Sequence, residues 1–170
     1  MIIINDTNIL IDLVHLNLMD EFILLDLELK TTDFVFEELN EDQKTIIEGY
    51  INQGNIELIT TVEEEDFVSI TAILGNSSGL SFEDCSVWHY ANKLNGILLS
   101  GDRKLRKQAT ANGISVKGIL YVFDQLLLND LISFDLALEK IEQLYEINPR
   151  LPIYSKNERT SNWLAQKHAG

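Results

Sequence analysis

The fold is decided by the stretch Leu98-Leu99-Ser100-Gly101-Asp102-Arg103-Lys104-Leu105-Arg106-Lys107. An apolar run of strand length ends at the serine and the glycine, and an acid follows at once. This order is typical of a buried strand that turns into a helix with an acid at its N-terminus. Open α/β sheets place their chemistry at the carboxyl ends of strands, so Asp102 beside four cations indicates a metal ion and a polyanion. The alternative is an Asp helix cap beside a solvated basic helix face.

The composition is that of a globular protein with one domain. The chain has 170 residues, of which 45% are hydrophobic. Its single cysteine, Cys85, excludes an internal disulfide framework and fits a reducing compartment. No apolar run approaches the roughly 20 residues that span a bilayer, and the first residues lack the basic region of a signal peptide. We therefore expect a cytoplasmic protein with no membrane partner.

The net charge of −14 is unusual for a protein that binds nucleic acid, but the charges are unevenly distributed. Residues 1–84 hold 19 acids and 2 bases, whereas residues 85–170 hold 8 acids and 11 bases. A local basic strip can attract a polyanion even when the whole protein is acidic. The alternative is that the acids serve only to keep the protein soluble.

Strand-like and helix-like segments alternate along the chain. The expected strands cover residues 2–4, 33–36, 56–60, 97–100 and 114–116. The expected helices cover residues 7–18, 37–51, 63–74, 81–94, 103–112, 118–128 and 136–145. This order predicts a three-layer α/β/α sandwich with a central parallel sheet of four to five strands. We expect the domain to cover residues 1–147 and to leave residues 148–170 as a C-terminal tail that contributes to an interface.

Four acids are expected at one edge of the sheet. Asp6, Glu38 and Asp102 each follow a predicted strand, and the carboxyl ends of parallel strands share an edge. Asp84 lies in the first turn of the helix that leads to the fourth strand, from which it can reach the same crevice. Carboxylates that converge without a lysine repel one another, and a divalent cation relieves the repulsion. Oxygen ligands suit Mg²⁺ or Mn²⁺.

Each of these acids also has a simpler interpretation. Asp6 and Asp102 are candidate helix caps, Asp84 is a candidate member of a capping box, and Glu37 competes with Glu38 for the inward position. A phosphatase of the haloacid dehalogenase type also has an Asp after its first strand. That chemistry requires a second Asp where this chain has Asn8, so we rank it low. Histidine spacing typical of a zinc site is absent.

Four stretches, taken in order, resemble the PIN-domain family over about residues 1–130. They are Ile4-Asn5-Asp6-Thr7-Asn8, Val35-Phe36-Glu37-Glu38-Leu39, Leu80-Ser81-Phe82-Glu83-Asp84 and Leu99-Ser100-Gly101-Asp102-Arg103-Lys104-Leu105. The resemblance implies a metal-dependent ribonuclease that prefers single strands. Many small bacterial members are VapC-like toxins of toxin–antitoxin pairs, so an antitoxin and a homodimer are the protein partners to consider. The alternative is a degenerate PIN-like module that binds RNA or a partner protein without cutting.

The resemblance also assigns roles to particular residues. It implies that Asp6, Glu38, Asp84 and Asp102 form the catalytic site and bind Mg²⁺ or Mn²⁺. Three polar residues flank the acids, where they can orient carboxylates or water: Thr7, Asn8 and Ser100. Four basic residues follow the last acid and are expected to contact RNA phosphates: Arg103, Lys104, Arg106 and Lys107. Helical spacing places Lys104 about 100° around the helix from Arg103, so the four cannot all contact one phosphate path equally.

Overall fold

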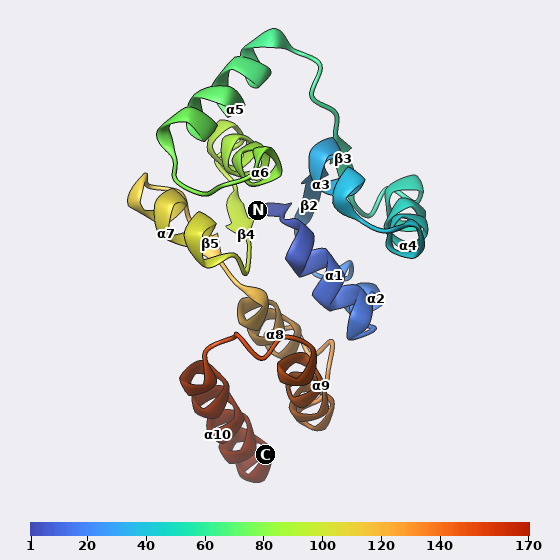
Figure 1. Ribbon diagram of the computed structural model, residues 1–170. Helices are drawn as coiled ribbons and strands as arrows, with labels where there is room; N and C mark the ends of the chain where they lie inside the picture. Colours follow the sequence, from blue (N-terminus) through green and yellow to red (C-terminus); the bar gives the residue numbers. More distant parts are fainter.

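Five parallel strands form one sheet in the computed structural model, which describes residues 1–170 (Figure 1). The strands are β1 (Ile2–Asn5), β2 (Glu28–Thr32), β3 (Glu57–Ile59), β4 (Ile97–Leu99) and β5 (Val116–Lys117). They lie in the order β3-β2-β1-β4-β5. The central strands β1 and β4 are rich in Ile and Leu because both of their faces are covered. The predicted parallel sheet is confirmed, although β5 begins two residues later than expected.

The strand order reverses between β1 and β4. The chain runs from β1 outward to β2 and β3, and then returns to the other side of β1 to form β4 and β5. Ile4 pairs with Leu98 and Asn5 with Leu99, so the two strands end level with each other. In open α/β sheets, ligands bind at the carboxyl edge beside such a switch point, because the connections leave in opposite directions there.

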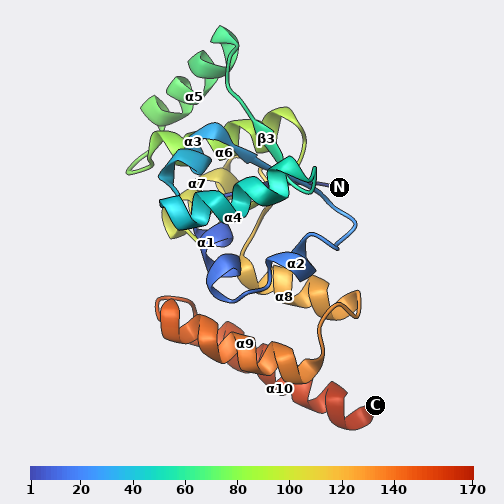
Figure 2. The same cartoon turned by 90° about the vertical axis from the view of Figure 1, so that its right-hand side faces the viewer.

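Helices flank the sheet and complete the predicted α/β/α sandwich (Figures 1 and 2). Those of the first half are α1 (Thr7–His15), α2 (Met19–Phe22), α3 (Asp33–Glu38), α4 (Glu41–Asn52) and α5 (Glu64–Asn76). Those of the second half are α6 (Phe82–Lys93), α7 (Arg103–Ala111), α8 (Ile119–Leu128), α9 (Phe134–Ile147) and α10 (Ile153–Ala169). Helix α6 packs against β1, β2 and β4, and α5 packs against α6. None of these helices is both long and apolar enough to span a membrane.

The prediction of the second strand was wrong. Residues 33–36 belong to helix α3, and the strand is β2, which precedes them. The side-chain oxygen of Thr32 accepts a hydrogen bond from the N–H of Val35 at 3.2 Å, which starts the helix there. Thr31 is fully buried, and its hydroxyl donates to the carbonyl of Asn5 at 2.9 Å. Polar side chains therefore occupy buried positions of β2, which hides the strand from a hydrophobicity pattern.

Glu38 therefore lies at the end of a helix, where the sequence predicted a position just after a strand. It is the last residue of α3 and does not follow a strand directly. The single helix expected from Glu37 toward Ile51 is two helices, α3 and α4. Helix α4 begins at its own capping box, in which the side chains of Asn40 and Gln43 each bind the other's backbone N–H.

The C-terminal segment is a docked helix, where only a tail was expected. Figure 2 shows α9 and α10 side by side at the end of the molecule far from α5. Trp163 is 4% exposed, and its ring stacks on Phe123 with 6.0 Å between centroids. The guanidinium of Arg159 binds both carboxylate oxygens of Asp124 on α8, the shortest contact being 2.8 Å. The domain boundary at residue 147 stays a prediction.

Candidate functional site

Asp6 lies at the carboxyl end of β1 and is 3% exposed. Its Oδ1 accepts a hydrogen bond from the N–H of Thr7 at 2.8 Å, which caps α1. Its Oδ2 accepts from Asn8 Nδ2 at 3.2 Å and from Ser100 Oγ at 2.6 Å. Burial raises the pKa of the Asp6 carboxyl to about 7, even though the hydrogen bond from Ser100 lowers it. Asp6 therefore holds a proton more tightly than an ordinary carboxyl does.

Polar side chains join the ends of β1 and β4 across the switch point. Besides donating to Asp6, the Ser100 hydroxyl accepts a hydrogen bond from the N–H of Asp102 at 3.0 Å. Asn8 accepts from the N–H of Gly101 at 2.8 Å. Residues that are more than 90 positions apart therefore share one hydrogen-bond network, which fixes Asp6 and Asp102 relative to each other.

Glu38 joins this network through Thr7, whose hydroxyl donates to Glu38 Oε2. Burial raises the pKa of Glu38, and the negative charges of Glu83 and Asp84 raise it further. Its neighbour Glu37 is exposed and pairs with Lys44 at 2.9 Å. Glu38 therefore belongs to the group of acids at the carboxyl edge of the sheet, which we call the acidic edge (Asp6, Glu38, Asp84 and Asp102), and Glu37 does not.

Asp84 and Asp102 each help to cap a helix: Asp84 is the third residue of α6 and forms a capping box with Ser81, and Asp102 is the N-cap of α7. The N–H of Ser81 donates to Asp84 Oδ2 at 2.8 Å, and the N–H of Asp84 donates to the Ser81 hydroxyl at 3.1 Å. The N–H of Leu105 donates to Asp102 Oδ1 at 2.7 Å. The capping interpretation is thus confirmed for both residues, as it is for Asp6. Each cap uses only one oxygen, and no protein hydrogen bond reaches Asp84 Oδ1 or Asp102 Oδ2.

Each of the four acids lies close enough to another of them for their negative charges to repel. After burial, the charge of Asp84 and then that of Glu38 raise the pKa of Asp6, and Asp102 raises the pKa of Asp84. None of the protein's ion pairs includes any of these four carboxylates. Their oxygen atoms and uncompensated charge suit a hard divalent cation. As they lie in the structure, no three of the His, Cys, Asp and Glu side chains form a closed ligand set.

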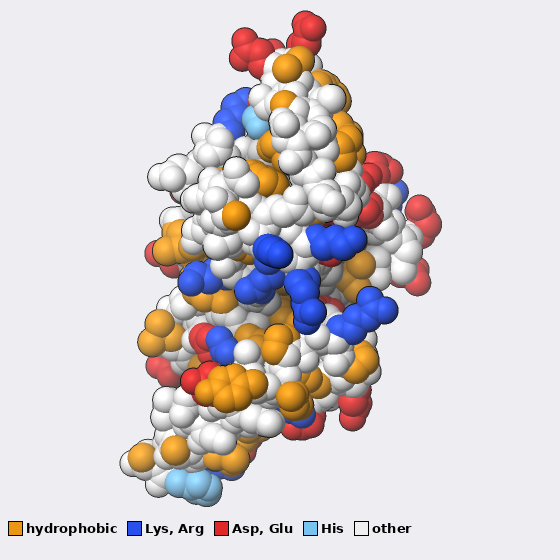
Figure 3. All heavy atoms as spheres, turned by 60° about the vertical axis from the view of Figure 1, so that its left-hand side comes forward, with side chains coloured by type: hydrophobic (Ala, Val, Ile, Leu, Met, Phe, Trp, Pro, Cys, Tyr) orange, Lys and Arg blue, Asp and Glu red, His pale blue; other side chains and the backbone are white.

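The four basic residues that are expected to contact RNA do not all line the same cavity. Arg103 and Arg106 line a cavity of about 530 Å³ at the carboxyl ends of β4 and β5, which Lys104 and Lys107 do not line. Lys104 reaches the turn before α6, where a Cβ on Gly79 would lie 2.9 Å from its Nζ. Figure 3 shows Lys and Arg side chains in a band across one face.

Three further cations line this cavity that the sequence did not reveal. They are Lys117, Arg150 and Arg159. Lys117 ends β5, Arg150 lies between α9 and α10, and Arg159 lies within α10. No local pattern links these positions, because Lys117 reaches the cavity through the pairing of β5 with β4, and Arg150 and Arg159 reach it only when the C-terminal segment packs against the domain.

The fold and the site define a parallel α/β protein with a group of four acids at the switch point of its sheet. The family model of the PIN domain, DUF3368, matches residues 2–162, so the chain belongs to the PIN-domain family. The match extends beyond the span of about residues 1–130 that carried the resemblance.

Two solved structures share the fold. One is a chain of VapBC-1 from nontypeable Haemophilus influenzae, with 15% identity and a TM-score of 0.50, covering 71% of this chain and 99% of that one. The other belongs to VapBC2 from Rickettsia felis bound to a DNA fragment from their promoter, with 12% identity and a TM-score of 0.51, covering 69% and 98%. At these identities the similarity is one of fold. No curated protein matches the chain.

Proposed function

We propose that the protein is a metal-dependent endoribonuclease that hydrolyses phosphodiester bonds of RNA. The observation that carries this proposal is the group of four acids at the switch point, with no cation paired to them and raised pKa values for Asp6, Glu38 and Asp84. Membership of the PIN-domain family supports it, because PIN domains are generally nucleases.

In this proposal Asp6, Glu38, Asp84 and Asp102 hold Mg²⁺ or Mn²⁺. Such an ion, when bound, would act as a Lewis acid that lowers the pKa of water and so makes hydroxide available for in-line attack on phosphorus. Ser100 orients Asp6 by its hydrogen bond. Because the pKa of Asp6 is about 7, protons compete with the cation there, and cation affinity rises with pH up to that value.

Thr7 and Asn8 position the acids by hydrogen bonds. Thr7 fixes Glu38, and Asn8 fixes both Asp6 and the turn at Gly101. No side chain is required as a nucleophile in this mechanism.

We further propose that the protein is the toxin of a toxin–antitoxin pair that acts in the cytoplasm, with an antitoxin as its protein partner. The VapBC proteins that share its fold support this role. One observation favours the alternative of a PIN module that binds RNA or a partner without cutting, namely that the acids do not form a closed ligand set. A cleavage assay decides between the two.

The test compares Asp6→Asn and Asp102→Asn with the unaltered protein on labelled single-stranded RNA, in Mn²⁺, in Mg²⁺ and in EDTA. We expect cleavage only with metal, and its loss in both variants, because each loses an anionic ligand and keeps a side chain that can cap its helix. Asp26→Asn is the matched control. Asp26 is exposed and precedes β2, at the opposite edge of the sheet, so this variant should cut normally. Full activity in either site variant would reject the assigned site.

A further inference from the structure

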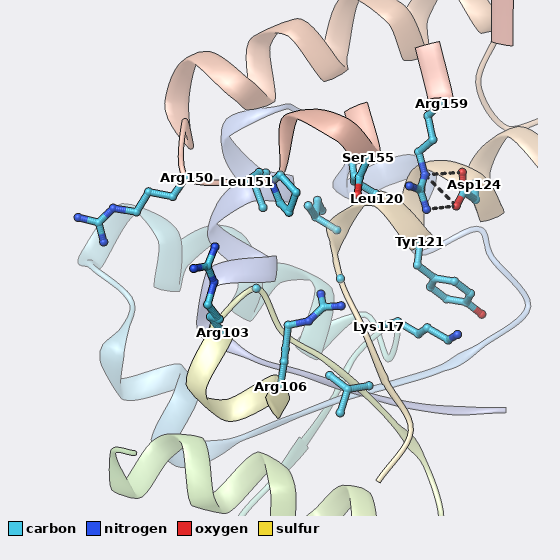
Figure 4. Close-up of a pocket in the computed structure, with 15 residues that line it drawn as sticks. Arg103, Arg106, Lys117, Leu120, Tyr121, Asp124, Arg150, Leu151, Ser155 and Arg159 are labelled. Carbon is cyan, nitrogen blue, oxygen red and sulfur yellow. Dashed lines mark hydrogen bonds and ion pairs between the residues drawn. The ribbon is translucent and has the colours of Figure 1, made fainter. Parts of the chain in front are cut away.

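The cavity beside α7 is bounded by two parts of the chain that are far apart in sequence (Figure 4). Arg103, Arg106 and Lys117 come from the sheet edge and α7. Arg150 and Arg159 come from the C-terminal segment. In Figure 4, Arg103 points from α7 toward the C-terminal segment at Leu151, whereas the guanidinium of Arg106 turns toward the segment between β5 and α8. The C-terminal segment forms the wall opposite α7.

The cavity carries an excess of positive charge. Its lining includes five cations and one acid, Asp124, which is paired with Arg159. Arg103, Lys117 and Arg150 form no ion pair. Since converging cations repel one another, their placement around one cavity favours an anionic ligand.

The guanidinium of Arg106 has a defined position in the cavity. Its Nη1 donates a hydrogen bond to the backbone carbonyl of Ser100 at 3.2 Å. It passes over Gly118, where the Cβ of any other residue would lie only 2.3 Å from Nη1. Partial desolvation lowers the pKa of Arg106, which is consistent with a cation held partly out of water without a counter-charge.

The cavity adjoins the acidic edge. Ser100 faces both sites, because its hydroxyl donates to Asp6 and its carbonyl accepts from Arg106. Gly101 lines the cavity and also donates to Asn8. A ligand in the cavity is therefore separated from the acids by the backbone of residues 100–101.

We infer that this cavity binds a backbone phosphate of single-stranded RNA, together with its base, next to the bond that is cut. The inference rests on the proposed function and adds that the C-terminal segment, residues 148–170, is part of the RNA site. The volume of about 530 Å³ lies within the roughly 300–1,000 Å³ of pockets for small ligands, so the cavity is large enough for a nucleotide.

An aromatic side chain in the same cavity supports a nucleotide over a simple anion. Tyr121 lines the wall, and Lys117 Nζ lies 5.8 Å from the centroid of its ring. Proteins that bind single strands combine cations for the phosphates with aromatic rings on which bases stack. The cavity supplies both kinds of group.

The experiment measures RNA binding by Arg103→Gln, Arg150→Gln and the double variant. The probe is a fluorescein-labelled single-stranded RNA of mixed sequence, followed by anisotropy in EDTA over a series of NaCl concentrations. Each single variant should bind severalfold more weakly, and each lost contact should lower the magnitude of the salt slope by about 0.7. Both arginines are exposed and unpaired, so the substitutions leave the core untouched.

Lys167→Gln is the matched control for Arg150→Gln, because it removes one positive charge from the same C-terminal segment, residues 148–170. Lys167 pairs with Asp135 and does not line the cavity, so this variant should bind like the unaltered protein. If Arg150→Gln binds RNA as Lys167→Gln does, or if no form binds RNA, the inference is overturned.

The two proposals fail in different ways. If the unaltered protein cuts RNA with metal while Arg150→Gln changes neither affinity nor salt slope, the nuclease proposal stands and the cavity is not its RNA site. If the unaltered protein cuts nothing but binds RNA with a slope that Arg150→Gln lowers, the cavity inference stands and the nuclease proposal fails.

Discussion

Asp6 is the residue in which the demands of structure and of function meet. It caps α1, receives three hydrogen bonds and is almost completely buried beside two other acids. An ordinary helix cap lies at the surface, where water stabilises its charge, whereas burial here makes the charge costly. The sequence identified the position of Asp6 because a β-branched run ended there. Its burial could not be predicted, since the hydroxyl and the strand that enclose it come from residues 97–100.

The raised pKa of Asp6 makes the protein's stability depend on pH. The pKa of Asp6 is about 7 when folded, against an ordinary 3.8, so the folded protein binds more protons between these values. Stability therefore falls as pH rises from about 4 to about 7 and stays lower above it. In EDTA, the melting temperature should drop from about pH 5 to about pH 8, and the drop should be smaller in Asp6→Asn. Part of the drop in melting temperature should remain in Asp6→Asn, because burial also raises the pKa of Asp12, to about 6. An equal drop in both proteins would contradict the assigned pKa.

The adjacent acids Glu37 and Glu38 provide a second test of single residues. Glu38 faces the acidic edge through Thr7, whereas Glu37 faces solvent and Lys44. In the metal-dependent cleavage assay, Glu38→Gln should lower the rate at least about 100-fold, because it removes a ligand charge. Glu37→Gln should leave the rate unchanged, since it loses only an exposed ion pair. Equal and mild effects would show that Glu38 does not serve the site.

Among the helices and strands, those with a clear hydrophobic pattern could be predicted from the sequence, and those with polar residues at buried positions could not. The buried runs of β1 and β4 were evident from the sequence, and so were the helices that follow them. Strand β2 was not, because Thr31 uses its hydroxyl to bind β1 and is buried as a polar residue. Helix α10 was not predicted either, because its sequence is polar and Trp163 is its only buried residue. The basic cavity depends on that helix and could not be foreseen without it.

Trp163 is the only residue of α10 that is buried. Trp163 stacks on Phe123, and truncating a buried Trp to Ala costs about 3–5 kcal/mol. Trp163→Ala should therefore release α10, which limited trypsin digestion detects as faster cleavage within residues 153–169. Leu164→Ala is the matched control, because Leu164 is 43% exposed and its truncation should leave digestion unchanged. Equal digestion of the two variants would show that Trp163 does not anchor the helix.

In the whole molecule, the acids of the first half of the sequence and the cations of the second half lie at two neighbouring sites. The first half supplies three of the four acids, and the second half supplies every cation of the cavity. The sheet joins the two halves along β1 and β4, so the acidic edge and the basic cavity meet at Ser100. A net charge of −14 therefore coexists with a local surface that can attract a polyanion.

A ribosome completes β1 long before it begins β4. Ser100 follows Asp6 by 94 positions, so the nascent chain exposes Asp6 without the hydroxyl that binds it and without Asp102. The first half cannot compensate, because β1 lacks its neighbour on that side until β4 is made. Contacts between distant positions also form slowly in the complete chain, because closing a long loop costs entropy. Chains released early therefore carry Asp6 and Glu38 without the strand and the acid that complete the group, so the four acids come together only in finished molecules.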